Sequence, residues 1–185
     1  MKAKTIPLLL LLTLSLTACV GTWTRIDGSA AHYQDAHYRV SLPVGWLRIT
    51  SDDSLILSKD GILVQTISIQ FKEHAKAFEK IKQASSPGML PSELAQLTIA
   101  EFQAVQDDSL PSLEVISNKP VEMGGIMGFE VQLLYKTDTG LRMGMLMRGV
   151  VDDEGYYLVK YNAPMLHYFE RDRPAYETLT ESLRL

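Results

Sequence analysis

Three residues in the second half of the chain, Asp138-Thr139-Gly140, have the letters of an aspartic-protease triplet. Protease chemistry of that kind requires two carboxylates that share one proton in a dimeric or two-lobed site. Here the triplet joins two segments of alternating polarity, and Asp-x-Gly is typical of a tight hairpin. We therefore interpret Asp138 as a turn residue and not as a catalytic acid.

Nucleophile motifs are absent from the remaining sequence. Neither Gly-x-Ser-x-Gly nor Ser-x-x-Lys occurs, and the glycine patterns that bind phosphates are also missing. We accordingly predict no catalytic residue and no enzyme activity. Because triads are defined by geometry and not by spacing, a hydrolase whose site is assembled from distant residues stays as an alternative.

A methionine-rich segment offers a different chemistry. Met143, Met145 and Met147 share one strand face with Leu141, and thioethers of this kind can bind Cu(I). Methionine also fills irregular cores well, and we favour packing under a helix over a small-ligand or metal carrier. The opposite face carries Arg142 and Arg148 with Gly144 and Leu146. We interpret it as a solvated sheet face, with an exposed recognition surface as the alternative.

Histidine and acidic residues do not form a recognisable metal motif. The spacing of the four histidines fits no paired zinc motif, and no acidic cluster has the pattern of a calcium loop. We therefore predict no metal and no cofactor, and assign these residues to solvated turns. The residues concerned are His32, His37, His74, His167, Asp52-Asp53, Asp107-Asp108 and Asp152-Asp153-Glu154.

The single cysteine follows a short apolar segment. Two lysines precede a leucine-rich stretch from Pro7 to Leu16, and small residues then lead to Cys19. A basic start, an apolar stretch and small residues are typical of a secretory signal, and the stretch is short for a bilayer span. Leu16-Thr17-Ala18-Cys19 resembles the lipobox of bacterial lipoproteins. That resemblance implies removal of residues 1–18 and acylation of Cys19.

The lipid would determine where the protein acts. Several acyl chains form a nearly permanent anchor, so Cys19 predicts a membrane partner and a cell-envelope location. The residue after Cys19 is Val20 and not Asp. By resemblance to enterobacterial sorting, the lack of Asp at this position implies delivery to the periplasmic leaflet of the outer membrane. Without the signal, 16 basic and 22 acidic residues give a formal charge of −6, which argues against nucleic acid as a partner.

The rest of the chain has the length of one domain. Residues 19–34 are polar and aperiodic, and we predict a lipidated tether there. Trp23 within it could enter the headgroup region or pack on the domain. The domain is expected over residues 35–185.

Alternating polarity predicts strands in the first part of this domain. Tyr38, Val40 and Leu42 indicate a half-buried strand that ends at a Pro43-Val44-Gly45 turn. Strands are expected from Trp46 to Thr50 and from Leu55 to Ser58, with a hairpin at Lys59-Asp60-Gly61. A long strand would present Leu63, Ile67, Ile69 and Phe71 on one face. A helical turn or two is expected between His74 and Lys82.

A helix capped by Ser92 is expected next, with Leu94, Leu97, Thr98, Phe102 and Val105 on its packed face. A strand is expected from Leu113 to Val121. In the next strand, the residues expected to face the core are Phe129, Val131, Leu133 and Tyr135. Those expected to face outward or toward a polar layer are Glu130, Gln132 and Lys136. Two hairpins then connect a three-stranded meander ending at Tyr161, and a final helix presents Tyr176, Leu179 and Leu183, with Pro174 in its first turn or at a kink.

The segment from Tyr38 to Trp46, with its Pro-x-x-Trp turn, resembles the opening of the PsbP-like superfamily. The order of the elements from about Gln34 to Leu185 is also similar to that family. The resemblance implies an α+β fold, a three-layer α/β/α sandwich with helices flanking an antiparallel sheet. It also implies binding of other macromolecules. We therefore expect a lipid-anchored, non-enzymatic binding or assembly module with a protein partner in the cell envelope.

Overall fold

The computed structural model describes residues 23–29, 31–51, 54–106, 110 and 112–185. Its helices are α1 (Pro91–Val105), α2 (Tyr168–Ser182) and a short 3-10 helix, η1 (His74–Lys76). Its strands are β1 (Thr24–Arg25), β2 (His32–Gln34), β3 (Arg39–Ser41), β4 (Leu47–Ser51), β5 (Ser54–Ser58), β6 (Thr66–Glu73), β7 (Glu114–Met123), β8 (Ile126–Lys136), β9 (Arg142–Val151) and β10 (Gly155–Pro164).

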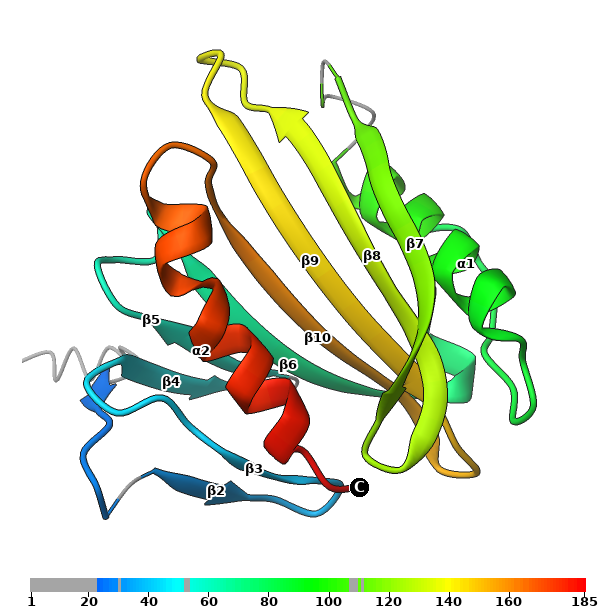
Figure 1. Cartoon of the computed structure of the whole chain (residues 1–185). Coiled ribbons are helices and arrows are strands. Elements are labelled where there is room, and N and C mark those ends of the chain that lie inside the picture. Colours follow the sequence, from blue (N-terminus) through cyan, green and yellow to red (C-terminus); the bar gives the residue numbers. More distant parts are fainter. Residues whose placement is uncertain (1–22, 30, 52–53, 107–109, 111) are drawn as a thin grey trace, which may run out of the picture.

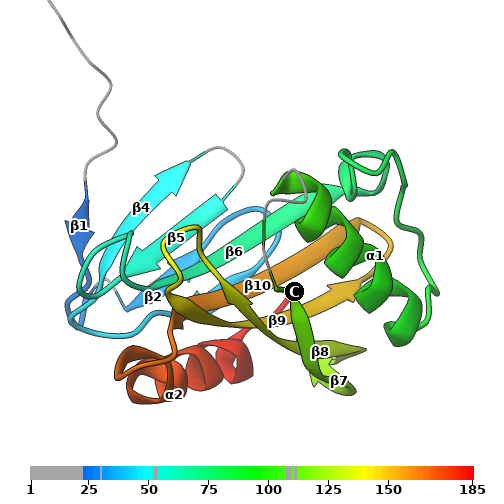
Figure 2. The same cartoon turned by 90° about the horizontal axis from the view of Figure 1, so that it is seen from above.

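Eight of these strands form one antiparallel sheet in the order β1-β4-β5-β6-β10-β9-β8-β7. The remaining two, β2 and β3, pair as a separate hairpin. Helix α1 packs on one face over β7, β8 and β9, whereas α2 packs on the other face against β10 and β3 (Figures 1 and 2). The predicted α+β architecture with helices flanking an antiparallel sheet is confirmed.

The fold begins earlier in the chain than expected. β1 and β2 both lie within the segment predicted to be a tether. Ile26 is buried, and its backbone N–H donates to the carbonyl of Trp46 at 2.8 Å. These strands are too short for a period-two pattern to appear in the sequence. They become evident only from their pairing with β4 and β3. Trp23, directly before β1, is partly exposed.

The loop between β5 and β6 also differs from the expectation. The strand β6 begins at Thr66, so Leu63 lies in the preceding turns and points into solvent. Ile67 and Ile69 are fully buried as predicted. The turn expected at Lys59-Asp60-Gly61 is therefore the first part of a longer loop that continues to Gln65.

Helix α1 begins differently from the prediction. Its N-cap is Leu90, whose side chain makes no capping hydrogen bond, and Pro91 is its first residue. Proline suits this position because its missing N–H would have had no intrahelical partner. The expected cap at Ser92 is therefore wrong, because this residue already lies inside the helix. The buried residues of α1 are Leu94, Ala95 and Thr98.

Helix α2 presents the predicted residues to the core. Tyr176 and Leu179 are buried, and Leu183 is buried at the C-cap. Pro174 lies inside the helix, beyond its first turn. The helix thus fills the second face of the sheet with the side chains that its sequence pattern indicated.

The strand β9 is buried on both faces. Met143, Met145 and Met147 lie in the core on the α1 side, which confirms their packing role. On the opposite side, Leu146 is buried and Arg148 is largely covered by α2. The predicted solvated face and the alternative recognition surface are therefore both wrong for Leu146 and Arg148, because α2 covers the sheet there.

Candidate functional site

The α1 face of the sheet is covered over only part of its width. α1 packs over β7, β8 and β9, and the described helices leave the α1 side of β5 and β6 uncovered (Figure 2). The side chains on that uncovered side are half-exposed and mostly polar. They come from β5, β6 and β10, and we call them the open face: Ser54, Ile56, Ser68, Gln70, Lys72, Lys160 and Asn162.

A cavity of about 220 Å³ lies where the open face meets α1. Its apolar wall includes Phe102 from α1 and Met147 and Leu158 from the sheet. Its polar wall includes Lys72 and Lys160, which come from the neighbouring strands β6 and β10. A pocket with an apolar wall and a few directed polar groups is typical of a binding site.

The two lysines give this cavity a positive character. Lys160 lies on the central strand β10, and its partial burial, together with the nearby charge of Lys72, lowers the pKa of its ammonium group. The acidic residue in the lining is Glu101. Its carboxylate is oriented by hydrogen bonds that it accepts from the backbone N–H groups of Lys80 and Ile81 at 3.0 and 3.2 Å. The cavity therefore suits a ligand group that carries negative charge.

A second and wider cavity, of about 720 Å³, lies beside the end of β6 and shares Gln70 and Lys72 with the first. Its other wall is the loop between β2 and β3. There the ring of His37 stacks on Phe71 with centroids 3.6 Å apart, and His37 Nδ1 lies 3.3 Å from a carboxylate oxygen of Glu154. The two cavities together form an extended hollow around the C-terminal half of β6.

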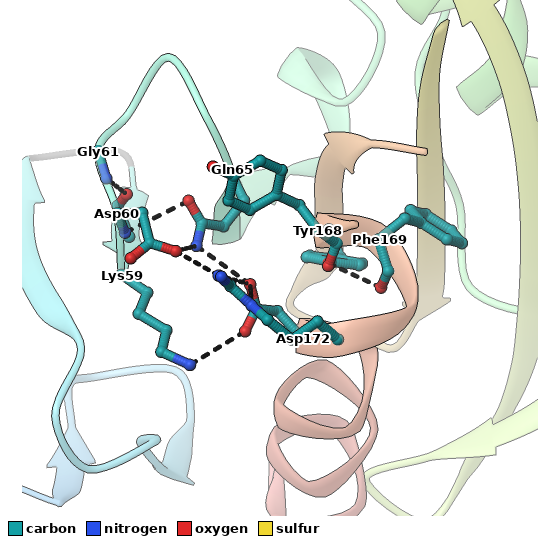
Figure 3. A network of polar contacts seen from close by, with 10 residues as sticks. Lys59, Asp60, Gly61, Gln65, Tyr168, Phe169 and Asp172 are labelled. Carbon is teal, nitrogen blue, oxygen red and sulfur yellow. Dashed lines mark hydrogen bonds and ion pairs between the residues drawn. The ribbon is translucent and has the colours of Figure 1, made fainter. Parts of the chain in front are cut away.

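A network of polar contacts fixes the β5–β6 loop to the start of α2 (Figure 3). The buried carboxylate of Asp172 accepts hydrogen bonds from Lys59 at 3.2 Å, from Gln65 at 3.1 Å and from Arg171. Arg171 also pairs with Asp60, which accepts a second bond from Gln65 at 2.9 Å. The loop and the helix are thereby held as one unit.

This network cannot act as a pair of carboxylates that share a proton. The hydrogen bond from Arg171 is the main cause that lowers the pKa of Asp60. Burial opposes ionisation of Asp172, but the bonds from Arg171 and Lys59 outweigh it and lower the pKa of this carboxyl too. Both groups are therefore ionised at neutral pH, and their role is to position the loop.

One serine–histidine contact could suggest a nucleophile. His74 Nδ1 lies 2.9 Å from Ser85 Oγ, and His74 Nε2 lies 3.3 Å from the backbone carbonyl of Asp153. The third group is thus a carbonyl and not a carboxylate. Ser85 is also buried, with 4 % of its surface exposed, so a substrate cannot reach its hydroxyl. Nothing in the sequence spacing indicated this pair, which stabilises a loop.

A second charged cluster lies between the sheet and α2. The carboxylate of Glu130 accepts bonds from Arg148 Nε at 2.5 Å and from Lys119 Nζ at 2.9 Å, and Arg148 also donates to Thr180 Oγ1 at 2.6 Å. Burial opposes the charge of Glu130, but these cationic partners lower the pKa of its carboxyl overall. Glu130 therefore faces a polar layer beneath α2, one of the two expected environments.

The structure also locates the residues considered for metal binding. Within the described ranges, no three or more His, Cys, Asp or Glu side chains are grouped so that they could hold a metal ion. Asp152 caps the β9–β10 turn by accepting bonds from the backbone N–H groups of Glu154 and Gly155 at 2.9 and 3.0 Å. Asp52-Asp53, Asp107-Asp108 and Cys19 lie outside the described residues.

The described helices contain no segment with the length and apolar character that crossing a bilayer requires. The turn at Asp138-Thr139-Gly140 connects β8 and β9, as predicted, with Gly140 at a φ of 81°. A positive φ favours glycine because the conformation crowds a Cβ atom. The protease-like triplet is therefore a hairpin.

Comparisons with known proteins agree with the fold. No family model and no curated protein matches the sequence. The cyanobacterial PsbP (CyanoP) of Synechocystis sp. PCC 6803 superimposes with a TM-score of 0.54 at 11 % identity, over 83 % of this chain and 91 % of that one. The Ran-binding protein Mog1p of Saccharomyces cerevisiae gives a TM-score of 0.53 at 9 % identity, over 88 % and 95 %. At this identity the likeness concerns the fold alone, and the chain has the PsbP-like fold.

Proposed function

We propose that this chain is a non-enzymatic binding module, anchored to a membrane of the cell envelope through lipid on Cys19, that binds a protein partner on its open face. The observation that carries the binding proposal is the cavity where the open face meets α1, because an apolar wall and the two lysines Lys72 and Lys160 meet there. The ionisable groups of the two charged networks described above are engaged in structural pairs, so this cavity is the site best suited to recognition.

The partner should carry chemistry complementary to the open face. Lys72 and Lys160 favour an acidic side chain, and the wall formed by Met147, Leu158 and Phe102 favours an apolar one beside it. The similarity to CyanoP and to a Ran-binding protein supports this proposal only as an analogy of fold. An acidic ligand would also match the lowered pKa of Lys160, because binding would compensate its buried charge.

The location follows from the sequence. Residues 1–18 have the features of an export signal, Leu16-Thr17-Ala18-Cys19 resembles a lipobox, and Val20 favours the outer membrane by analogy with enterobacterial sorting. Metabolic labelling with a palmitate analogue tests the anchor. We expect label in the wild-type chain and none in Cys19→Ser. Label at the wild-type level in Cys19→Ser would contradict the lipoprotein assignment.

The binding site can be tested in the native envelope. A photo-crosslinking amino acid at Gln70 should join the lipidated chain to a defined protein, whereas the same probe at Glu114, which is exposed on β7, should not. Lys72→Glu should remove the crosslink, and the matched charge reversal Lys80→Glu should leave it. Equal crosslinking in both reversed variants would exclude the open face as the binding site.

A further inference from the structure

Four aliphatic side chains project from turns of the described chain with little contact to the domain. Leu63 is 93 % exposed, Leu166 83 %, Val44 64 % and Ile62 54 %. Single exposed apolar residues are ordinary on protein surfaces, but several at neighbouring turns indicate an interaction surface. We call these four residues the apolar tips.

The sheet register places all four apolar tips at one end of the molecule. β4 begins where β5 ends, since Leu47 pairs with Ser58, and β6 begins where β10 ends, since Thr66 pairs with Asn162. The β3–β4 turn, the β5–β6 loop and the β10–α2 turn must therefore project from the same end of the sheet. Figures 1 and 2 show these three connections together on the left side of the molecule.

The network of Figure 3 fixes the β5–β6 loop and pairs the charges at its base. Gln65 and Asp60 hydrogen-bond across the base of the β5–β6 loop, and Gly61 accepts a backbone bond from Val64 at 2.8 Å. Ile62 and Leu63 are thus held at the tip of an ordered loop. The charges beside them are paired, Asp60 with Arg171 and Lys59 with Asp172, which lowers the cost of approaching an apolar phase.

The first described strand lies at this same end. β1 pairs with the start of β4, and the backbone N–H of Gly45, next to Val44 in the β3–β4 turn, donates to the carbonyl of Ile26 at 2.8 Å. Five residue steps separate Cys19 from Thr24, and a fully extended chain of that length reaches at most about 18 Å. The anchor thus keeps the β1 end of the domain close to the bilayer.

We propose that the apolar tips insert into the membrane surface that holds the lipid of Cys19, so that the domain has one fixed orientation on the bilayer. This inference rests on the proposed lipid anchor and adds the orientation to it. Trp23, partly exposed between Cys19 and β1, suits the headgroup region of the same surface. Because the contact is apolar, it does not need attraction between the protein and anionic headgroups. It is therefore compatible with the acidic charge of the mature chain.

In this orientation the opposite end of the sheet points away from the membrane. That end carries the β7–β8 and β9–β10 turns and the end of β6, beside which the wider cavity lies. The hollow at Gln70 and Lys72 thereby stays accessible to a partner that approaches from the aqueous side. The two proposed surfaces can therefore be occupied at the same time.

The test uses the full lipidated chain reconstituted into vesicles of phosphatidylethanolamine and phosphatidylglycerol. Nitroxide labels are placed on Leu63→Cys, Leu166→Cys and Val44→Cys, with Met127→Cys as the matched control. Met127 is an exposed apolar residue as well, at 58 %, but lies at the other end of the sheet. We expect a several-fold higher ratio of oxygen to nickel-chelate accessibility at the three tip labels than at Met127, and an aqueous value at Met127.

A second variant tests whether the tips act together. Leu63→Asp with Leu166→Asp should return the label at Val44 to the aqueous ratio, and both positions are exposed enough to leave the fold intact. Mass spectrometry of the same sample reports the lipid on Cys19. Lipid present with aqueous tip labels would overturn this inference and leave the anchor in place. Absence of lipid on Cys19 would overturn both.

Discussion

The two faces of the sheet are filled in different ways. Beneath α2, aromatic rings and buried charges lie together: Tyr161 stacks between Phe169 and Tyr176 with centroids 5.4 and 5.9 Å away, and the Glu130–Arg148 pair lies beside them. Beneath α1 the core combines aliphatic side chains and methionines with the ring pair of Phe78 and Tyr156, and it contains a buried hydroxyl pair between Thr98 and Tyr156 at 2.6 Å but no buried ion pair among the described residues. α2 and the β2–β3 hairpin cover the α2 face, whereas the α1 face continues into the open face.

This difference indicates which side of the protein is structural and which side can recognise a partner. On the α2 face, charged groups have specific partners on other elements, so they fix α2 and the β5–β6 loop in place. On the α1 face, Lys72 and Lys160 line a cavity and repel each other. Charged groups that line a cavity and lower the stability of the fold are common in functional sites.

Replacing an α1-face core residue should have the largest effect. Val131 is fully buried, so Val131→Asp would bury a charge without a partner and should cost more than about 4 kcal/mol, enough to unfold a marginally stable domain. Val115→Asp is the matched control, because Val115 is half-exposed on the edge strand β7, and should change the free energy of unfolding by about 0.5 kcal/mol. Circular dichroism and urea denaturation measure both, and similar losses would contradict the assignment of faces.

The α2 face should be most sensitive at its buried ion pair. Arg148→Met leaves the carboxylate of Glu130 buried with Lys119 as its remaining cationic partner, which should cost about 3 kcal/mol. The double variant Arg148→Met with Glu130→Leu removes both charges and should recover part of that loss. Urea denaturation of the single and double variants gives the coupling, and additive losses would show that the pair is not interacting.

The polar network of Figure 3 should make stability depend on pH. Asp172→Asn weakens the bonds from Arg171 and Lys59 and should cost about 1–2 kcal/mol at pH 7. The pKa of Asp172 is lowered in the folded state, so its stabilising effect is complete above the unfolded pKa of about 4 and is lost as the pH falls through the folded pKa. Wild type should therefore lose stability below about pH 4 more steeply than Asp172→Asn, which thermal unfolding at several pH values can measure.

Replacing Lys160 on the open face should change the free energy of unfolding the least, and should raise it where the other substitutions lower it. Lys160→Met removes a charge whose pKa is lowered by burial and by Lys72, so the free energy of unfolding at pH 7 should rise by less than about 1 kcal/mol. The wild-type penalty is present below the folded pKa and disappears as the pH rises toward the unfolded pKa of about 10.4. The gain should therefore shrink toward that pH. Exposed Lys80→Met should show no such trend, and a loss of stability in Lys160→Met would contradict the analysis.

Sequence patterns predicted the elements whose signal is local. Alternation identified the strand that holds Phe129, Val131 and Leu133, and the same argument placed the three methionines of β9 in the core. Turn chemistry identified Asp138-Thr139-Gly140 and the Asp152 turn. These predictions succeeded because side-chain periodicity and turn preferences depend on a few neighbouring residues.

The candidate sites had no comparable signal. Lys72 and Lys160 are far apart in the sequence, and they meet only because β6 pairs with β10 beyond the edge of α1. Alternation predicts Leu63 on a strand face, but this residue lies in a loop, where an apolar side chain continues the alternating pattern by chance. Burial of Glu130 also depended on Arg148 of β9, which lies between Glu130 and Thr180 of α2 and bonds to both.

The sequence alone thus predicted most of the helices and longer strands, the methionine core and an acylated Cys19. Tertiary structure decided which side of each strand is covered, how early the fold begins and which turns meet at one end of the sheet. The physical reason is that periodicity reports only that a face is apolar or polar. Whether a helix, a partner or a membrane covers that face depends on contacts between residues distant in the sequence, such as those of α2 with the β5–β6 loop.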